Sequence, residues 1–155
     1  MKALFVCTGN SCRSVMAEYL YNYLARRESL DQCHARSCGI AAQPSFQVPN
    51  FVKKVLAARG ISDIQHTPQL VSRFLVEWAD AVYPMTRSHL EVLQEMYPNH
   101  RDKMFLFLQK ADMGAKDVED PIGRSEEMYE TCCRTIEQGV QGILNHVKSA
   151  TNPRP

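Results

Sequence analysis

The sequence predicts an α/β protein with a four-stranded parallel sheet and helices on both faces. Short apolar runs, typical of strands buried on both faces, alternate with segments whose apolar residues recur at helical spacing. Strands that alternate with helices indicate a parallel sheet, because each helix carries the chain back to the same edge. A chain of 155 residues fits one domain. We expect this domain to span residues 1–148 and residues 149–155 to form a disordered tail.

Four segments are expected to form the strands. Residues 2–6 come first and contain a nearly continuous apolar run, Ala-Leu-Phe-Val. Residues 33–37, 81–85 and 103–108 follow, and the last of these has Met-Phe-Leu-Phe-Leu at its centre. Pro84 cannot donate a hydrogen bond to a neighbouring strand, so it indicates the end of the third strand.

Five segments have the spacing of helices. They cover residues 14–28, 49–59, 72–79, 88–97 and a long final stretch that begins after residue 125. Pro49 suits the first position of its helix, and Gly60 suits the stop that follows it. In the third of these helices, Phe74, Leu75 and Trp78 are expected to be buried.

The composition argues against several classes of protein. A net charge of +1 gives no reason to expect a nucleic-acid partner or a membrane surface. No stretch approaches the roughly 20 apolar residues of a membrane span, and the first apolar run is too short for a signal peptide. We therefore expect a cytoplasmic protein with reduced thiols. The six cysteines form neither a disulfide framework nor a Cys-x2-Cys pair, so we expect no metal and no cofactor.

Residues 7–14, Cys-Thr-Gly-Asn-Ser-Cys-Arg-Ser, link the first strand to the first helix. A loop at this place points several backbone N–H groups into one concavity, and the helix dipole adds positive potential. Arg13 supplies a planar fork for two oxygens of an oxyanion, and the same field favours a thiolate at Cys7. The segment therefore predicts a nucleophile at the bottom of a cup that binds a tetrahedral dianion. The expected phosphate-binding residues are Thr8, Gly9, Asn10, Ser11, Cys12, Arg13 and Ser14.

This loop resembles the phosphate-binding loop of the low-molecular-weight protein tyrosine phosphatases. Bacterial protein arginine phosphatases share the loop, as do the more distant thioredoxin-coupled arsenate reductases. The similarity covers essentially the whole chain. It continues at Met16-Ala17-Glu18, Arg36-Ser37-Cys38-Gly39, Trp78-Ala79-Asp80, Met85-Thr86 and Asp120-Pro121.

The resemblance implies the fold of that family and a phosphocysteine mechanism acting on phosphorylated proteins. Cys7 is then the nucleophile, Arg13 stabilises the phosphoryl group, and Asp120 is the general acid and later the base. From the residues alone, Asp120 follows the fourth predicted strand in a polar loop, so it can reach the same edge of the sheet as Cys7. An Asp-Pro pair in a loop is, however, often only a turn. Ser14 can donate to the thiolate, and Asn10 can fix the turn of the loop.

Several positions depart from the pattern of the tyrosine phosphatases. The residue after Ser14 is Val15, where the family usually has proline. Ser11 replaces a branched aliphatic side chain, which resembles the arginine phosphatases and the arsenate reductases. Ile122 replaces an aromatic wall of the substrate site, although Phe46 can supply a wall from the opposite loop. These features favour phosphoarginine slightly over phosphotyrosine.

Two alternative functions are weaker. An arsenate reductase of this fold needs two further cysteines, typically in the region that here spans residues 80–96, and this region contains none. A non-catalytic phosphate-binding relative would not need all three of Cys7, Arg13 and Asp120, which are present.

Overall fold

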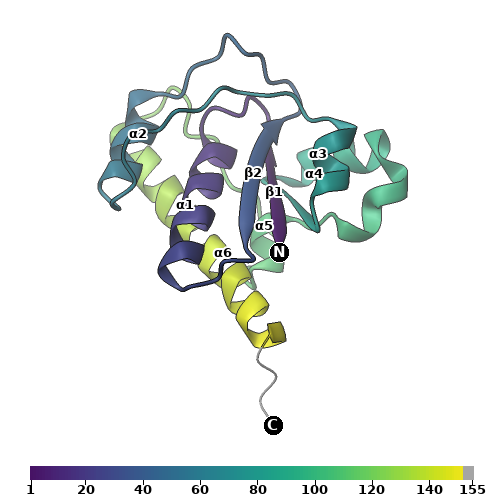
Figure 1. Cartoon of the computed structure of the whole chain (residues 1–155). Helices are drawn as coiled ribbons and strands as arrows, with labels where there is room; N and C mark the ends of the chain where they lie inside the picture. The colour runs from purple at the N-terminus through teal and green to yellow at the C-terminus, as the bar shows by residue number, and fades with distance from the viewer. Residues whose placement is uncertain (152–155) are drawn as a thin grey trace.

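The computed structural model describes residues 1–151, in which a three-stranded parallel sheet forms the centre (Figure 1). The strand order is β2 (His34–Gly39), β1 (Lys2–Cys7) and β3 (Ala81–Pro84). The middle strand β1 is buried from its second residue onward. Its apolar run therefore packs on both faces, as its sequence predicts, and its carboxyl end lies at the centre of one edge of the sheet.

The prediction of a fourth strand at residues 103–108 is wrong. Met104 makes only an isolated parallel bridge to Val82, and the chain then turns into the short helix α5 (Phe107–Lys110). A short apolar run is buried equally well as a strand or as a helix, so periodicity alone does not distinguish them. Phe107 is fully buried and approaches Gly139 so closely that a Cβ there would lie 2.6 Å from the ring. Packing against the last helix therefore decides the conformation.

Helices cover both faces of the sheet (Figure 1). Helices α1 (Arg13–Arg27), α2 (Asn50–Ala57) and α6 (Glu126–Thr151) lie on one side. Helices α3 (Arg73–Trp78) and α4 (Arg87–Met96) lie on the other, followed by the 3₁₀ segment η1 (Pro98–Lys103). None of the helices in the described part of the chain is both long and apolar enough to cross a membrane.

The end of α6 differs from the sequence prediction. A disordered tail was expected to begin at residue 149, but α6 continues through Thr151. Residues 149–151 are therefore helical, and residues 152–155 lie outside the described residues.

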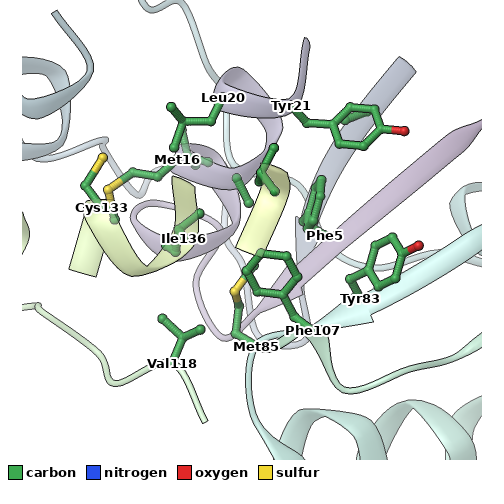
Figure 2. Close-up of a cluster of buried hydrophobic side chains, with 14 of the residues drawn as sticks. Phe5, Met16, Leu20, Tyr21, Tyr83, Met85, Phe107, Val118, Cys133 and Ile136 are labelled. Atoms are coloured by element: carbon green, nitrogen blue, oxygen red, sulfur yellow. The ribbon is translucent and has the colours of Figure 1, made fainter. Parts of the chain in front are cut away.

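The larger core lies between the sheet and helices α1 and α6. Figure 2 shows the rings of Phe5, Tyr21, Tyr83 and Phe107 gathered around β1. The ring centroids of Phe5 and Phe107 lie 5.5 Å apart with their planes nearly perpendicular, an arrangement that aromatic pairs favour. This packing fixes the strand that ends in Cys7.

The smaller core lies under α3 and α4, and one prediction for it is wrong. Leu75 and Val76 are buried and Trp78 is partly buried, whereas Phe74 is 67% exposed. Because α3 has only six residues, one narrow stripe of it faces the sheet. Phe74 instead lies near the Arg36 guanidinium, 5.9 Å from its ring centroid.

Candidate active site

Cys7 is the last residue of β1 and lies at the carboxyl edge of the sheet. Its side chain is 2% exposed, and Cys7 Sγ lies 2.9 Å from Ser14 Oγ, in hydrogen-bond contact. Ser14 is the second residue of α1 and is fully buried. The Ser14 hydroxyl is therefore placed to donate to a thiolate on Cys7.

Asn10 is the structural centre of the loop. It adopts a left-handed conformation with φ of 53° and is fully buried. Its Nδ2 donates to Ser14 Oγ and to Ser37 Oγ, each at 2.9 Å. Its Oδ1 accepts from the Gln69 backbone N–H at 3.0 Å and lies 2.9 Å from His66 Nε2. All the hydrogen-bonding capacity of the amide is thus used, which fixes the turn that the sequence predicts.

Gly39, the last residue of β2, lets that strand pass directly beneath the loop. A Cβ at this position would lie 2.4 Å from the Thr8 carbonyl oxygen and 2.9 Å from the Asn10 nitrogen. Just after Gly39, the Ile40 backbone N–H donates to the Cys7 carbonyl oxygen at 3.0 Å. Any larger residue at position 39 would displace the loop.

Arg13 joins this loop to the segment that carries Asp120. The side chain of Arg13 is nearly buried, and its Nη1 donates to the Val118 carbonyl oxygen at 3.1 Å. Its Nη2 lies 3.4 Å from Asp120 Oδ2. The side chain of Asp120 is 45% exposed, and its Oδ1 accepts from the Ile122 N–H at 3.1 Å. The structure thus brings Cys7, Arg13 and Asp120 to one edge of the sheet.

The side of the site between the Cys7 loop and Asp120 is called its mouth, and three further predicted residues lie in or next to the segments that border it. Phe46 is 39% exposed. Its ring lies next to Gly9, since a Cβ built on Gly9 would be only 3.5 Å away from it. Ile122 is 54% exposed. Ser11 is 6% exposed, and its Oγ lies 3.9 Å from Cys12 Sγ, so its hydroxyl is largely within the loop.

Burial raises the pKa values of four of the other cysteines. All six cysteines are free, and burial raises the pKa of the Cys12 thiol to about 11. Burial also raises the pKa values of Cys132 and Cys133 to about 12 and shifts the pKa of Cys38 upward. These thiols are therefore protonated near neutral pH.

Sequence reasoning missed two titratable residues. Burial raises the pKa of the Glu18 carboxyl to about 7, although the Ser37 hydroxyl, which donates to Glu18, opposes the shift. His89, on α4, is 4% exposed, and its Nε2 lies 2.8 Å from Thr8 Oγ1. A lone histidine in a helical pattern gave no signal for this contact.

Residues 1–151 contain no group of three or more histidine, cysteine or acidic side chains arranged to hold a metal ion. The polar side chain in contact with Cys7 is instead the Ser14 hydroxyl, and the Arg13 guanidinium and the Asp120 carboxylate pair with each other nearby. A buried cysteine and an arginine in a loop between a parallel strand and a helix, with a carboxylate opposite, are the arrangement of cysteine-dependent phosphatases.

The family model described as low molecular weight phosphotyrosine protein phosphatase matches residues 2–152, so the chain belongs to this family. It is 32% identical over 148 residues to a protein-arginine-phosphatase of Bacillus subtilis, covering 96% of this chain and 97% of that protein. It is 31% identical over 146 residues to the low molecular weight protein-tyrosine-phosphatase PtpB of Staphylococcus aureus, covering 93% and 95% of the two chains. The protein is thus an enzyme of the low-molecular-weight protein phosphatase type.

Solved structures agree with this assignment. A crystal structure of a YwlE mutant from Bacillus subtilis superposes with a TM-score of 0.90 at 31% identity, covering 96% of this chain and 99% of that chain. A YwlE arginine phosphatase mutant with a phosphorylated active-site serine gives the same TM-score and identity, with 96% of each chain covered.

Proposed function

We propose that this protein hydrolyses phosphorylated proteins through a phosphocysteine on Cys7, without a metal, and that it prefers phosphoarginine to phosphotyrosine. The observation that carries the proposal is the meeting of Cys7, Arg13 and Asp120 at the carboxyl edge of the sheet. The Ser14 hydroxyl contacts the Cys7 sulfur. One terminal nitrogen of Arg13 donates to the Val118 carbonyl oxygen, and the other lies beside the Asp120 carboxylate, which is half-exposed.

In the first step the Cys7 thiolate attacks phosphorus and forms the S–P bond. The backbone N–H groups of residues 8–13 and the Arg13 guanidinium stabilise the charge on the phosphoryl oxygens. The bond from phosphorus to the leaving oxygen or nitrogen breaks as Asp120 donates its proton to that atom. Because the Asp120 carboxyl is half-exposed, it can contact a leaving group that extends out of the cup.

In the second step water attacks phosphorus and the S–P bond breaks. Asp120, now a carboxylate, takes the proton of this water, and the thiolate of Cys7 is restored as phosphate leaves. The Ser14 hydroxyl stabilises that thiolate as the leaving group. A relative in the YwlE group with serine as its active-site residue was captured phosphorylated on that serine, which supports a covalent intermediate at the equivalent position.

The preference for phosphoarginine draws on two features. Ser11 is small and polar where the tyrosine enzymes have a branched aliphatic residue, and Ile122 removes an aromatic wall. The relative from Bacillus subtilis is named a protein-arginine-phosphatase. A phosphotyrosine ring gains most from aromatic walls, and Phe46 offers only one, 39% exposed.

The partners proposed are therefore phosphorylated proteins. We also propose a cytoplasmic location, because a catalytic thiolate needs a compartment that keeps thiols reduced.

The first experiment measures hydrolysis of an aryl phosphate in the presence of a metal chelator. We expect full activity that orthovanadate blocks, and no reduction of arsenate by the same preparation. Loss of activity on chelation would contradict the metal-independent mechanism. Arsenate reduction without phosphatase activity would favour the alternative reductase.

The second experiment compares kcat/KM on phosphoarginine and phosphotyrosine peptides of the same sequence. We expect the parent enzyme to favour phosphoarginine and Ser11→Ile to shift the ratio toward phosphotyrosine. A ratio that Ser11→Ile leaves unchanged, in a variant that still binds phosphate, would show that Ser11 does not set the preference.

A further inference from the structure

Thr8 and His89 form a pair that the mechanism above does not use. Thr8 directly follows the nucleophile and is the exposed residue of the loop. Its Oγ1 lies 2.8 Å from Nε2 of His89, the third residue of α4. The His89 backbone N–H donates to the capping Thr86 Oγ1 at 3.1 Å, so the imidazole is held on an ordered helix start.

The imidazole has one nitrogen without a partner. His89 Nδ1 is buried and contacts no donor or acceptor within residues 1–151. A buried N–H without an acceptor is costly, whereas a bare ring nitrogen is tolerated better. The ring hydrogen therefore belongs on Nε2, which donates it to Thr8 Oγ1.

The charge of the ring follows from its surroundings. Burial, together with the positive charge of Arg13, lowers the pKa of His89 to about 4, while Asp117 and Asp120 act in the opposite direction. His89 is therefore neutral at physiological pH, with the single donor hydrogen on Nε2.

A donor from His89 leaves the Thr8 hydroxyl oxygen with one lone pair free. A phosphoguanidinium group carries several N–H donors and needs acceptors close to the phosphorus. The ring and ester oxygen of phosphotyrosine carry no donor at the corresponding place. A fixed acceptor at the mouth therefore distinguishes the two leaving groups.

We propose that the Thr8 hydroxyl oxygen accepts an N–H group of a substrate phosphoguanidinium and that His89 positions this hydroxyl. The inference rests on the proposed function and deepens it, because it assigns a specificity-determining pair that faces the leaving group. Thr8 would then contact the substrate, and His89 would act through Thr8.

The test compares Thr8→Val, which keeps the shape and removes the hydroxyl, with Thr8→Ser, which keeps the hydroxyl. We expect Thr8→Val to lower kcat/KM for a phosphoarginine peptide at least about tenfold more than for the matching phosphotyrosine peptide, the lower end of the loss for a hydrogen bond to a charged group. Thr8→Ser should retain most of the parent ratio. An equal loss on both peptides in Thr8→Val overturns the inference.

His89 is tested by a double-mutant cycle on the same ratio. We expect His89→Leu to lower the preference about threefold and His89→Gln, whose amide nitrogen can reach Thr8, to restore it. In the Thr8→Val background, His89→Leu should leave the ratio unchanged, since its partner is gone. An additive effect in that background overturns the positioning role, because it shows that His89 acts on specificity by another route.

The parent enzyme separates this inference from the proposed function. If the parent cleaves phosphotyrosine only, the proposed preference fails and the inference fails with it. If the parent cleaves phosphoarginine and Thr8→Val keeps the parent ratio, only the inference is overturned.

Discussion

The phosphate loop (residues 7–14) and the acid loop (residues 112–125) share one edge of the sheet but are stabilised in opposite ways. Most of the phosphate loop is buried, and its central Asn10 uses every hydrogen bond its amide can make. Most of the acid loop is exposed, including Asp120 and Ile122. It is attached at a few points, where the Val118 N–H donates to Met85 O at 2.9 Å and Asp117 Oδ1 accepts from the Arg87 N–H at 2.8 Å.

This difference corresponds to the two chemical tasks. Stabilising charge on a phosphoryl group requires dipoles that are already oriented before the substrate arrives. A proton donor must instead reach different leaving groups and then water, so it benefits from exposure. Changes at the buried residues that build the phosphate loop, such as Cys7 and Asn10, should therefore affect all substrates alike, whereas changes at Asp120 should depend on the leaving group.

The largest effect is expected at the nucleophile. Cys7→Ser should lower kcat at least about 10³-fold on every substrate, because a serine hydroxyl is a far weaker nucleophile than a thiolate. Binding of inorganic phosphate, measured by calorimetry, should persist because the loop donors remain. Cys132→Ser, at a buried cysteine of α6, is the control and should keep its activity. Near-normal turnover by Cys7→Ser would refute the mechanism.

Asp120→Asn tests the acid loop. We expect a loss on the order of 10²–10⁴ on substrates with poor leaving groups and a smaller loss on an activated aryl phosphate, which needs less protonation. Steady-state rates on both substrates measure the difference. Asp112→Asn, an exposed acid of the same loop whose carboxylate pairs with His146, should change neither rate. An equal loss on both substrates would mean that Asp120 serves the fold and not proton transfer.

Asn10→Ala tests the rigid loop. We expect a loss of about 2–4 kcal/mol in the free energy of unfolding, because buried partners lose their hydrogen bonds. Activity should fall about 10- to 100-fold by a similar factor on all substrates. Asp63→Ala, at an exposed residue with φ of 56°, controls for the left-handed backbone alone. Denaturant unfolding measures the change in stability, and steady-state rates measure the change in activity. A loss of unfolding free energy no larger than that of Asp63→Ala would show that the amide network adds little.

The smallest effect concerns Glu18, which accepts from Ser37 beneath the phosphate loop. Burial raises its pKa from 4.5 to about 7, so the folded state favours the neutral carboxyl. Its contribution to stability is present below about pH 4.5 and is lost as the pH rises through 7. We expect the free energy of unfolding to fall by about 2 kcal/mol relative to Glu18→Gln between pH 5 and pH 8.

The quantity to measure is the difference in the free energy of unfolding between the parent and Glu18→Gln. Burial lowers the pKa of the neighbouring His66, whose contribution is lost as the pH falls and therefore runs in the opposite direction. His66 is present in both proteins, so its contribution cancels. Parallel pH profiles of the parent and Glu18→Gln would show that Glu18 is ionised throughout this range in the folded state.

The sequence by itself determined the features that depend on residues close together in the chain. Residues 7–14 are contiguous, so the strand, the loop and the helix start that place Cys7 and Arg13 could be predicted from their order alone. The resemblance added Asp120, and the structure brings its carboxylate within 3.4 Å of Arg13. The three main strands and the covering helices followed from periodicity, with ends that differ by one or two residues at most positions.

Only the tertiary structure decided the features that depend on partners far apart in sequence. The fourth apolar run became a bridge and a short helix because Phe107 packs against Gly139 of α6, a choice that its own five residues do not encode. Phe74 is exposed because α3 is short and only one stripe of it faces the sheet. The contact of His89 with Thr8 joins residues 81 positions apart. Such contacts leave no local pattern, since burial and hydrogen bonding across the fold depend on which surfaces meet when the chain closes.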